Sequence, residues 1–130
     1  MTRSTKERRG QNAYDRGRIA EVLCLTRLWL TGWSILGHRL VGKRGTGLGE
    51  IDIVARRGST IAFIEVKARN DDASAREAVS ATQRKRIETA AQTYLARHPK
   101  HQSCDVRFDV MILTKGVVPH RIADAWRPES

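Results

Sequence analysis

Three charged residues interrupt two apolar runs in the segment GEIDIVARRGSTIAFIEVKAR, residues 49–69. Asp52 stands in the first run, and Glu65 and Lys67 stand two positions apart in the second. A divalent cation would relieve the repulsion between two neighbouring carboxylates, and Mg²⁺ binds one or two carboxylates together with water and phosphate oxygens. An adjacent ammonium can orient a nucleophile or stabilise charge on a phosphate. These residue types indicate hydrolysis of phosphodiester bonds with Mg²⁺ or Mn²⁺ as the cofactor.

The two runs read as β-strands, at residues 50–56 and 60–67, joined by a turn that contains Gly58. Successive side chains of a strand point to opposite faces. Glu65 and Lys67 are therefore expected on the same face of the second strand. An ion pair on a solvated strand face is the simpler alternative for these two residues, and such a pair contributes little to stability.

The register of this hairpin decides whether Asp52 reaches Glu65. A tight turn that pairs Arg56 with Ser59 places Asp52 opposite Phe63 and diagonal to Glu65. Diagonal neighbours lie about 7–8 Å apart, a separation at which two carboxylates can share one ion. The hairpin thus makes Asp52 and Glu65 candidate metal ligands, and an acid at a strand edge is the alternative for Asp52.

A helix is predicted from Asp15, its N-cap, to Gly32. One face of this helix consists of Ile19, Val22, Leu23, Thr26, Trp29 and Leu30. Because Cys24, Leu25 and Leu28 widen this stripe, the helix is expected to pack on more than one side. Glu21 interrupts an apolar side of this helix, and a buried carboxylate needs a partner such as a metal, its water or Lys67. The alternative is a carboxylate at the helix border that reaches Arg18 or solvent.

A second long helix is predicted over residues 75–97, with Asp72 or Ser74 as its cap. Gln83 lies on the core stripe of this helix, four residues after Val79. The Gln83 amide either points toward the carboxylates or forms a hydrogen bond with the sheet. Helical periodicity does not separate these two alternatives.

The remaining elements complete an α/β protein. Residues 33–40 read as an edge strand, residues 105–113 as another strand and residues 120–126 as a short final one. A hairpin followed by a helical crossover predicts a mixed β-sheet flanked by helices, in the order helix, strand, strand, strand, helix, strand. Residues 1–13 are polar and aperiodic, so a disordered basic tail is expected before a single domain over residues 14–130.

The charge of the chain points to a polyanionic partner. Twenty-four Lys and Arg against fourteen Asp and Glu give a formal net charge of +10, which attracts nucleic acid. Six cations are candidates for contacts with phosphates: Arg39, Lys43, Arg44, Arg84, Lys85 and Arg86. No apolar run reaches the roughly 18 residues of a membrane span, and no secretory signal is recognised, so a cytoplasmic protein without membrane contact is expected.

Asp52, a spacer of twelve residues and then Glu65-Val66-Lys67 resemble the core motif of the PD-(D/E)XK nuclease superfamily. Four blocks resemble the YraN-type bacterial family, which is placed within that superfamily and is related to archaeal Holliday junction resolvases: GRIAE (17–21), GEIDIVA (49–55), FIEVKAR (63–69) and RFDVMIL (107–113). The likeness covers residues 14–127. It implies a restriction-endonuclease-like core and a nuclease that acts on DNA.

Carried over by position, the resemblance implies that Asp52 and Glu65 bind the metal, that Lys67 is the catalytic lysine and that Glu21 is an additional helix acid. Gln83 resembles the glutamine that some superfamily members place on the helix after the motif. The resolvase kinship favours branched DNA as the substrate, in recombination or repair, and a homodimer as the assembly. A non-catalytic nucleic-acid-binding protein that keeps the fold is the alternative, because fold alone does not fix function.

Overall fold

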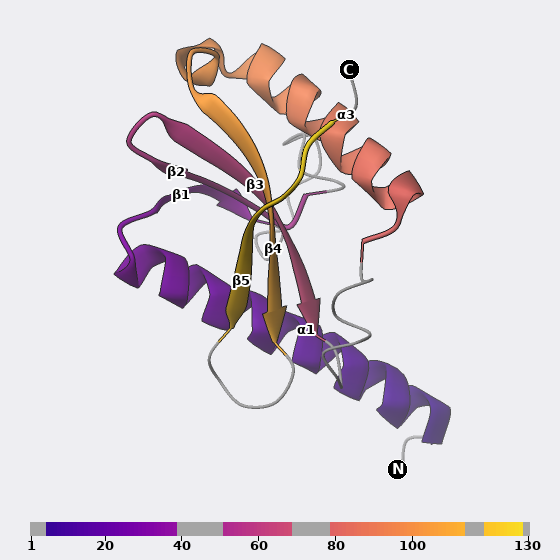
Figure 1. Cartoon of the computed structure of the whole chain (residues 1–130). Helices are drawn as coiled ribbons and strands as arrows, with labels where there is room; N and C mark the ends of the chain where they lie inside the picture. The colour runs from indigo at the N-terminus through magenta and orange to yellow at the C-terminus, as the bar shows by residue number, and fades with distance from the viewer. Residues whose placement is uncertain (1–4, 39–50, 69–78, 114–118, 129–130) are drawn as a thin grey trace.

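The computed structural model describes residues 5–38, 51–68, 79–113 and 119–128. These residues form one five-stranded sheet in the order β1-β2-β3-β4-β5 (Figure 1). Its strands are β1 (Ser34–His38), β2 (Ile53–Arg57), β3 (Thr60–Ala68), β4 (Asp105–Leu113) and β5 (His120–Trp126). β3 and β4 run parallel, and the other neighbouring strands run antiparallel. The predicted mixed sheet is confirmed.

Two helices, α1 (Thr5–Leu30) and α3 (Ala81–Arg97), cover opposite faces of the sheet (Figure 1). The core on the α1 face consists of Cys24, Leu28, Trp33, Ile53, Ala55, Ala62, Ile64 and Met111. The core on the α3 face includes Ile61, Phe63, Ile87, Ala91, Tyr94, Phe108 and Val110. Because β3 contributes alternate residues to the two cores, Glu65 and Lys67 fall on the α3 face, together with Ile61 and Phe63, as predicted.

The turn between β2 and β3 lies one residue later than predicted. Arg57 pairs with Thr60, and Gly58 and Ser59 form the two-residue turn, so the predicted pairing of Arg56 with Ser59 is wrong. Gly58 has a φ of +60°. A type II′ hairpin requires such an angle at its first central position, and glycine adopts it without strain.

This turn moves every pair of the hairpin by two residues. Ile53 faces Ile64. Asp52 directly precedes Ile53, so it lies beside Glu65 and not opposite Phe63, as was predicted. The corrected register brings the two acids closer than a diagonal arrangement would.

α1 begins at Thr5, so the predicted start at Asp15 is wrong. The stretch between these positions is rich in Lys, Arg, Glu and Gln. Such residues have high helix propensity and can extend a helix without an apolar stripe. Residues 5–13, which were expected in a disordered tail, thus belong to the helix, and the single domain over residues 14–130 stays a prediction.

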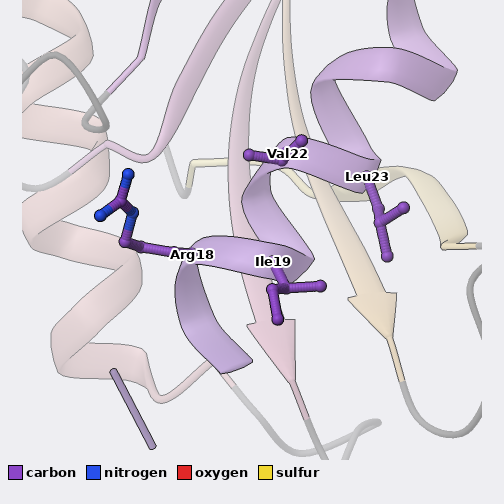
Figure 2. A pocket seen from close by; sticks show the side chains of 4 residues that line it. All are labelled: Arg18, Ile19, Val22 and Leu23. Atoms are coloured by element: carbon purple, nitrogen blue, oxygen red, sulfur yellow. The ribbon is translucent and has the colours of Figure 1, made fainter. Parts of the chain in front are cut away.

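α1 packs on the sheet through only part of its predicted apolar surface. Ala20, Cys24 and Leu28 are buried. Cys24 and Leu28 belong to the predicted widening of the stripe, whereas its first-named face is exposed or half-exposed and consists of Ile19, Val22, Leu23, Thr26, Trp29 and Leu30. Figure 2 shows three of these residues lining a pocket beside Arg18. Helix-to-sheet distance depends on the side chains at the contact, and the small Ala20 and Cys24 allow a close approach.

The N-cap of α3 is Ser80, whose hydroxyl accepts a hydrogen bond of 3.1 Å from the N–H of Gln83. The residue before Ser80 is not helical, so the predicted helix over residues 75–97 starts too early. The predicted caps Asp72 and Ser74 lie outside the described residues. A serine satisfies the free N–H groups of the first turn, which explains why the helix begins here.

The other predicted strands are confirmed. β1 lies at an edge of the sheet, and β4 has the predicted bounds, Asp105–Leu113. β5 is the predicted final strand and pairs with β4. Among the described residues, no helix is long and apolar enough to cross a membrane.

Candidate functional site

The carboxylate of Asp52 is held against the backbone of β3. Asp52 lies in a bend directly before β2 and is 8% exposed. Its Oδ2 accepts a hydrogen bond of 2.8 Å from the N–H of Val66. Val66 follows Glu65, so this hydrogen bond fixes the Asp52 carboxylate next to the second acid. The structure therefore brings the two predicted metal ligands together.

The carboxylate of Glu65 is 4% exposed and receives two cationic or polar groups on one oxygen. Gln83 Nε2 donates a hydrogen bond of 3.0 Å to Glu65 Oε1. The ammonium of Lys67 lies 3.3 Å from the same oxygen. Ser80 caps the first turn of α3 and thereby fixes the backbone of Gln83. Of the predicted site residues, Asp52, Glu65, Lys67 and Gln83 thus converge.

Asp52 and Glu65 repel each other in a buried site, which disfavours ionisation of both acids. Burial raises the pKa of Glu65 to about 7, and the negative charge of Asp52 acts in the same direction. The ammonium of Lys67 lowers the pKa of Glu65 but does not outweigh these two effects. Neighbouring carboxylates in a buried site do not ionise together easily. Near neutral pH the pair therefore retains a proton part of the time, and a bound cation would displace it.

The second oxygen of Glu65 fits a divalent cation. Glu65 Oε2 is buried and has no hydrogen-bond partner within the part of the chain that the structure describes. A buried acceptor without a donor costs free energy, which a cation or its water would remove. Mg²⁺ takes one or two protein carboxylates and fills its remaining positions with water and phosphate oxygens. Asp52 and Glu65 supply such a pair.

Glu21 is buried on α1, with 9% of its surface exposed, but it does not join the ligand pair. Burial, reinforced by the charges of Glu21 and then Asp52, raises the pKa of the Cys24 thiol to about 12. Both acids therefore lie close enough to this thiol to act on its pKa. In residues 18–38, 51–68, 79–113 and 119–128, no three His, Cys, Asp or Glu side chains gather into a larger ligand group.

The six cations that were predicted to contact phosphates fall into two groups. One group lies outside the described residues and consists of Arg39, Lys43 and Arg44. The other group is exposed near the start of α3 and consists of Arg84, Lys85 and Arg86. The guanidinium carbon of Arg84 lies 5.5 Å from the ring centre of Trp126, so this side chain packs on a core aromatic. Contacts of these cations with nucleic acid stay predictions.

Ser80 is a positioning residue that the sequence reasoning missed. Its spacing of three from Gln83 matches a capping box, in which the third helical residue returns a side-chain hydrogen bond to the cap. Here the backbone half of the box is present, because the Gln83 N–H donates to Ser80. The Gln83 side chain instead donates to Glu65. The spacing of three between Ser80 and Gln83 is the sequence signal that could have placed the start of this helix at Ser80.

Together these contacts define an α/β protein in which one hairpin of a mixed sheet carries a buried pair of carboxylates. The sequence profile of the uncharacterised protein family UPF0102 matches residues 20–113. The chain belongs to this family. The matched region contains all five predicted catalytic residues, which are Glu21, Asp52, Glu65, Lys67 and Gln83.

Relatives of similar length cover nearly the whole chain. A UPF0102 protein of Paramagnetospirillum magneticum is 45% identical over 127 residues, which are 98% of each chain. A UPF0102 protein of Parvibaculum lavamentivorans is 42% identical over 119 residues, which are 92% of this chain and 86% of the relative. A UPF0102 protein of Caulobacter vibrioides is 40% identical over 97% of this chain and 98% of its own. These names give the family and no activity.

Proposed function

We propose that this protein is a metal-dependent endonuclease of the PD-(D/E)XK type that hydrolyses phosphodiester bonds of DNA. The observation that carries the proposal is the position of the two buried carboxylates. Asp52 is fixed beside Glu65 by a hydrogen bond of 2.8 Å to the following residue. The Lys67 ammonium lies 3.3 Å from Glu65 Oε1, and Lys67 holds the position of the lysine in the motif that the sequence resembles.

Each residue has a chemical task in this proposal. Asp52 and Glu65 would hold Mg²⁺ or Mn²⁺, which when bound lowers the pKa of a water molecule and neutralises charge on the scissile phosphate. Lys67 would stabilise negative charge on the phosphate or orient the attacking water. Gln83 positions Glu65 through its hydrogen bond of 3.0 Å. Glu21 stays outside the ligand pair and would act through the charge it adds near Asp52.

DNA is the proposed substrate because the chain carries a formal net charge of +10, and polyanions are attracted by such a field. Branched DNA is favoured by the resemblance to junction resolvases, and the cytoplasm is the proposed location. These statements extend the family assignment, which names no substrate.

Cleavage assays test the proposal. Purified protein is incubated with labelled four-way junction, flap, single-stranded and linear DNA, with Mg²⁺, with Mn²⁺ or with EDTA. We expect products only with a metal, and a loss of at least about 100-fold in rate for Asp52→Asn and for Glu65→Gln. Asp105→Asn is the matched control, because Asp105 is exposed at the start of β4. Products that persist undiminished in both site variants would remove the proposed site.

A non-catalytic nucleic-acid-binding protein is the second candidate. The basic charge supports binding as well as cleavage, whereas the buried acids have no task in simple binding, since carboxylates repel phosphates. Tight binding of DNA by the wild-type protein without products, under every metal condition, would favour this second function.

We also propose a homodimer as the active assembly. Trp29 and Leu30 are 70% and 71% exposed, and Ile19 and Val22 are 55% and 48% exposed. The spacing of Ile19, Val22, Thr26 and Trp29 is that of a heptad, by which two helices pack together. Val22→Glu should lower the mass measured by sedimentation to that of a monomer, while Thr89→Glu on α3 should leave it unchanged. A wild-type protein that sediments as a monomer at high concentration would contradict the dimer.

A further inference from the structure

A second group of charges surrounds Trp33 on the α1 face of the sheet. Trp33 is 2% exposed and follows the end of α1. Three guanidinium carbons lie near the centre of its ring, at 4.7 Å for Arg57, 5.1 Å for Arg121 and 5.5 Å for Arg107. Arg27 of α1 lies close enough to Arg121 to lower the pKa of that side chain. We call these four residues the arginine cluster.

The arginine cluster lies away from the carboxylate pair. Arg57 ends β2, whereas Asp52 precedes the same strand. Five residues of extended chain separate them, or about 16 Å. Lys67 and Gln83 contact Glu65 on the α3 face, and the arginine cluster belongs to the α1 face.

The positive charge of the cluster exceeds its local negative charge. Asp109 is fully buried and accepts two hydrogen bonds from Arg107, of 3.2 and 2.8 Å. Arg121 lies 3.7 Å from the same carboxylate. Arg27 and Arg57 form no ion pair with any of the described residues, although Arg57 donates to the carbonyl of Thr31.

Burial and the neighbouring guanidinium groups hold the pKa of Arg121 below its usual value, against the opposing effect of Asp109. Like charges repel one another, and an anion that lies between them reduces the repulsion. Arg27 and Arg57 are exposed, and Arg107 and Arg121 are partly exposed. Arginine carries five N–H donors in a planar fork that matches phosphate oxygens. Within the described part of the chain, hydrogen bonds use two donors of Arg107 and one of Arg57.

We propose that the arginine cluster binds phosphate groups of DNA, on a segment that lies outside the active site. For a branched substrate, this segment would be an arm that is not cut. The inference rests on the proposed function only in taking DNA as the ligand, because binding at the cluster does not require cleavage. Phosphate contacts of this kind set orientation and carry no base specificity.

Binding in EDTA tests the inference separately from cleavage. Anisotropy of a labelled four-way junction is measured over a range of salt for the wild type and for the Arg27→Gln/Arg121→Gln double variant. This variant leaves the Arg107–Asp109 and Arg57–Thr31 contacts intact. We expect affinity to fall about tenfold or more, and the slope of log K against log salt to decrease by about two, since each phosphate contact contributes about 0.9. Lys100→Gln, which removes one exposed cation, should change the slope by less than one.

Two further variants make the outcome unambiguous. Arg27→Lys/Arg121→Lys keeps both charges and should bind nearly as the wild type does, and melting temperatures show whether each variant is folded. Asp52→Asn should bind DNA at least as well as the wild type even where cleavage is lost. Wild-type affinity and slope in the folded glutamine double variant would overturn the inference. Stabilisation of the wild type by inorganic phosphate, with unchanged DNA binding in the double variant, would overturn it as well.

Discussion

Two buried carboxylates of similar exposure, Asp109 and Glu65, have very different surroundings. Asp109 is fully buried, and its two oxygens accept hydrogen bonds from Arg107 and from the N–H of Asp124. Glu65 is 4% exposed, lies beside a second acid, and has one oxygen without a hydrogen-bond partner among the described residues. Among the described residues, both oxygens of Asp109 thus have hydrogen-bond donors, whereas only one oxygen of Glu65 has them.

This difference separates a structural acid from a candidate ligand. A buried charge is tolerated when charge-assisted hydrogen bonds compensate for its lost hydration, as they do at Asp109. Asp124 even adopts a φ of +53° at the point where its N–H reaches that carboxylate. Glu65 has a raised pKa of about 7 and an unsatisfied oxygen, which are the properties expected where a cation is to bind.

The largest expected effect concerns Lys67, which lies beside the carboxylate pair. Lys67→Met should lower the rate of DNA cleavage by about 100- to 10,000-fold, because a positive charge near the developing phosphate charge is lost. DNA affinity in EDTA should change less than threefold. Lys100→Met, the same change at an exposed lysine, should keep the wild-type rate. Equal rates for the wild type and Lys67→Met, under saturating metal, would contradict the role of Lys67.

Neutralising the structural acid should destabilise the protein. Asp109→Asn should lower the free energy of unfolding by about 2–4 kcal/mol, because Arg107 loses its counter-charge and one donor then faces an amide N–H. Denaturant titration measures this change. Asp105→Asn, an exposed position on the same strand, should stay within about 0.5 kcal/mol of the wild type. A similar small change at Asp109 would remove the distinction between the two acids.

Neutralising Glu65 should stabilise the metal-free protein, in contrast to the same change at Asp109. Its pKa is raised from 4.5 to about 7, so the folded state binds the proton more tightly than the unfolded state does. Metal-free stability should therefore fall as pH rises from about 4.5 to about 7 and then level off. Glu65→Gln should abolish this fall and be more stable than the wild type at pH 8, by at most about 3 kcal/mol.

Unfolding in EDTA at several pH values measures this effect. Glu88→Gln, a change of the same kind on α3, should keep the wild-type dependence on pH. A Glu65→Gln variant that is less stable than the wild type at pH 8 would show that the carboxylate is already satisfied by the protein.

The smallest effect is expected at the residue that positions Glu65. Gln83→Ala removes the hydrogen bond of 3.0 Å to Glu65 Oε1. It should lower stability by about 1 kcal/mol and weaken Mn²⁺ binding by about tenfold. Gln92→Ala on the exposed side of the same helix is the matched control. Unchanged Mn²⁺ affinity in Gln83→Ala would mean that Glu65 needs no support from α3.

Strand positions and the faces of β3 could be predicted from the sequence because alternation is a local signal. The side of α1 that meets the sheet could not be predicted, since apolar residues cover more than one side of this helix and periodicity does not tell which of them is buried. The hairpin register depends on where the turn lies, and a shift of the turn by one residue changes every pair. Gly58 fixes the turn through its left-handed conformation.

The acids, the lysine and Gln83 were predictable as candidates because three of them lie on one hairpin and the fourth on a core stripe. The arginine cluster was not predictable. Its members come from α1, β2, β4 and β5, and only the folded sheet brings three of them around Trp33 and the fourth, Arg27, near Arg121. Whether Glu21 joined the carboxylate pair also depended on the tertiary position of α1.

The most direct test of the central claim is a calorimetric titration of Mn²⁺ into the metal-free protein, without DNA, at pH 7.5. The claim is that Asp52 and Glu65 together hold one divalent cation. We predict a single site in the wild type, weakened more than tenfold in both Asp52→Asn and Glu65→Gln, with Asp105→Asn unchanged. Mn²⁺ binding of equal affinity in the wild type and both site variants, or no binding to the wild type at millimolar metal, would contradict the claim.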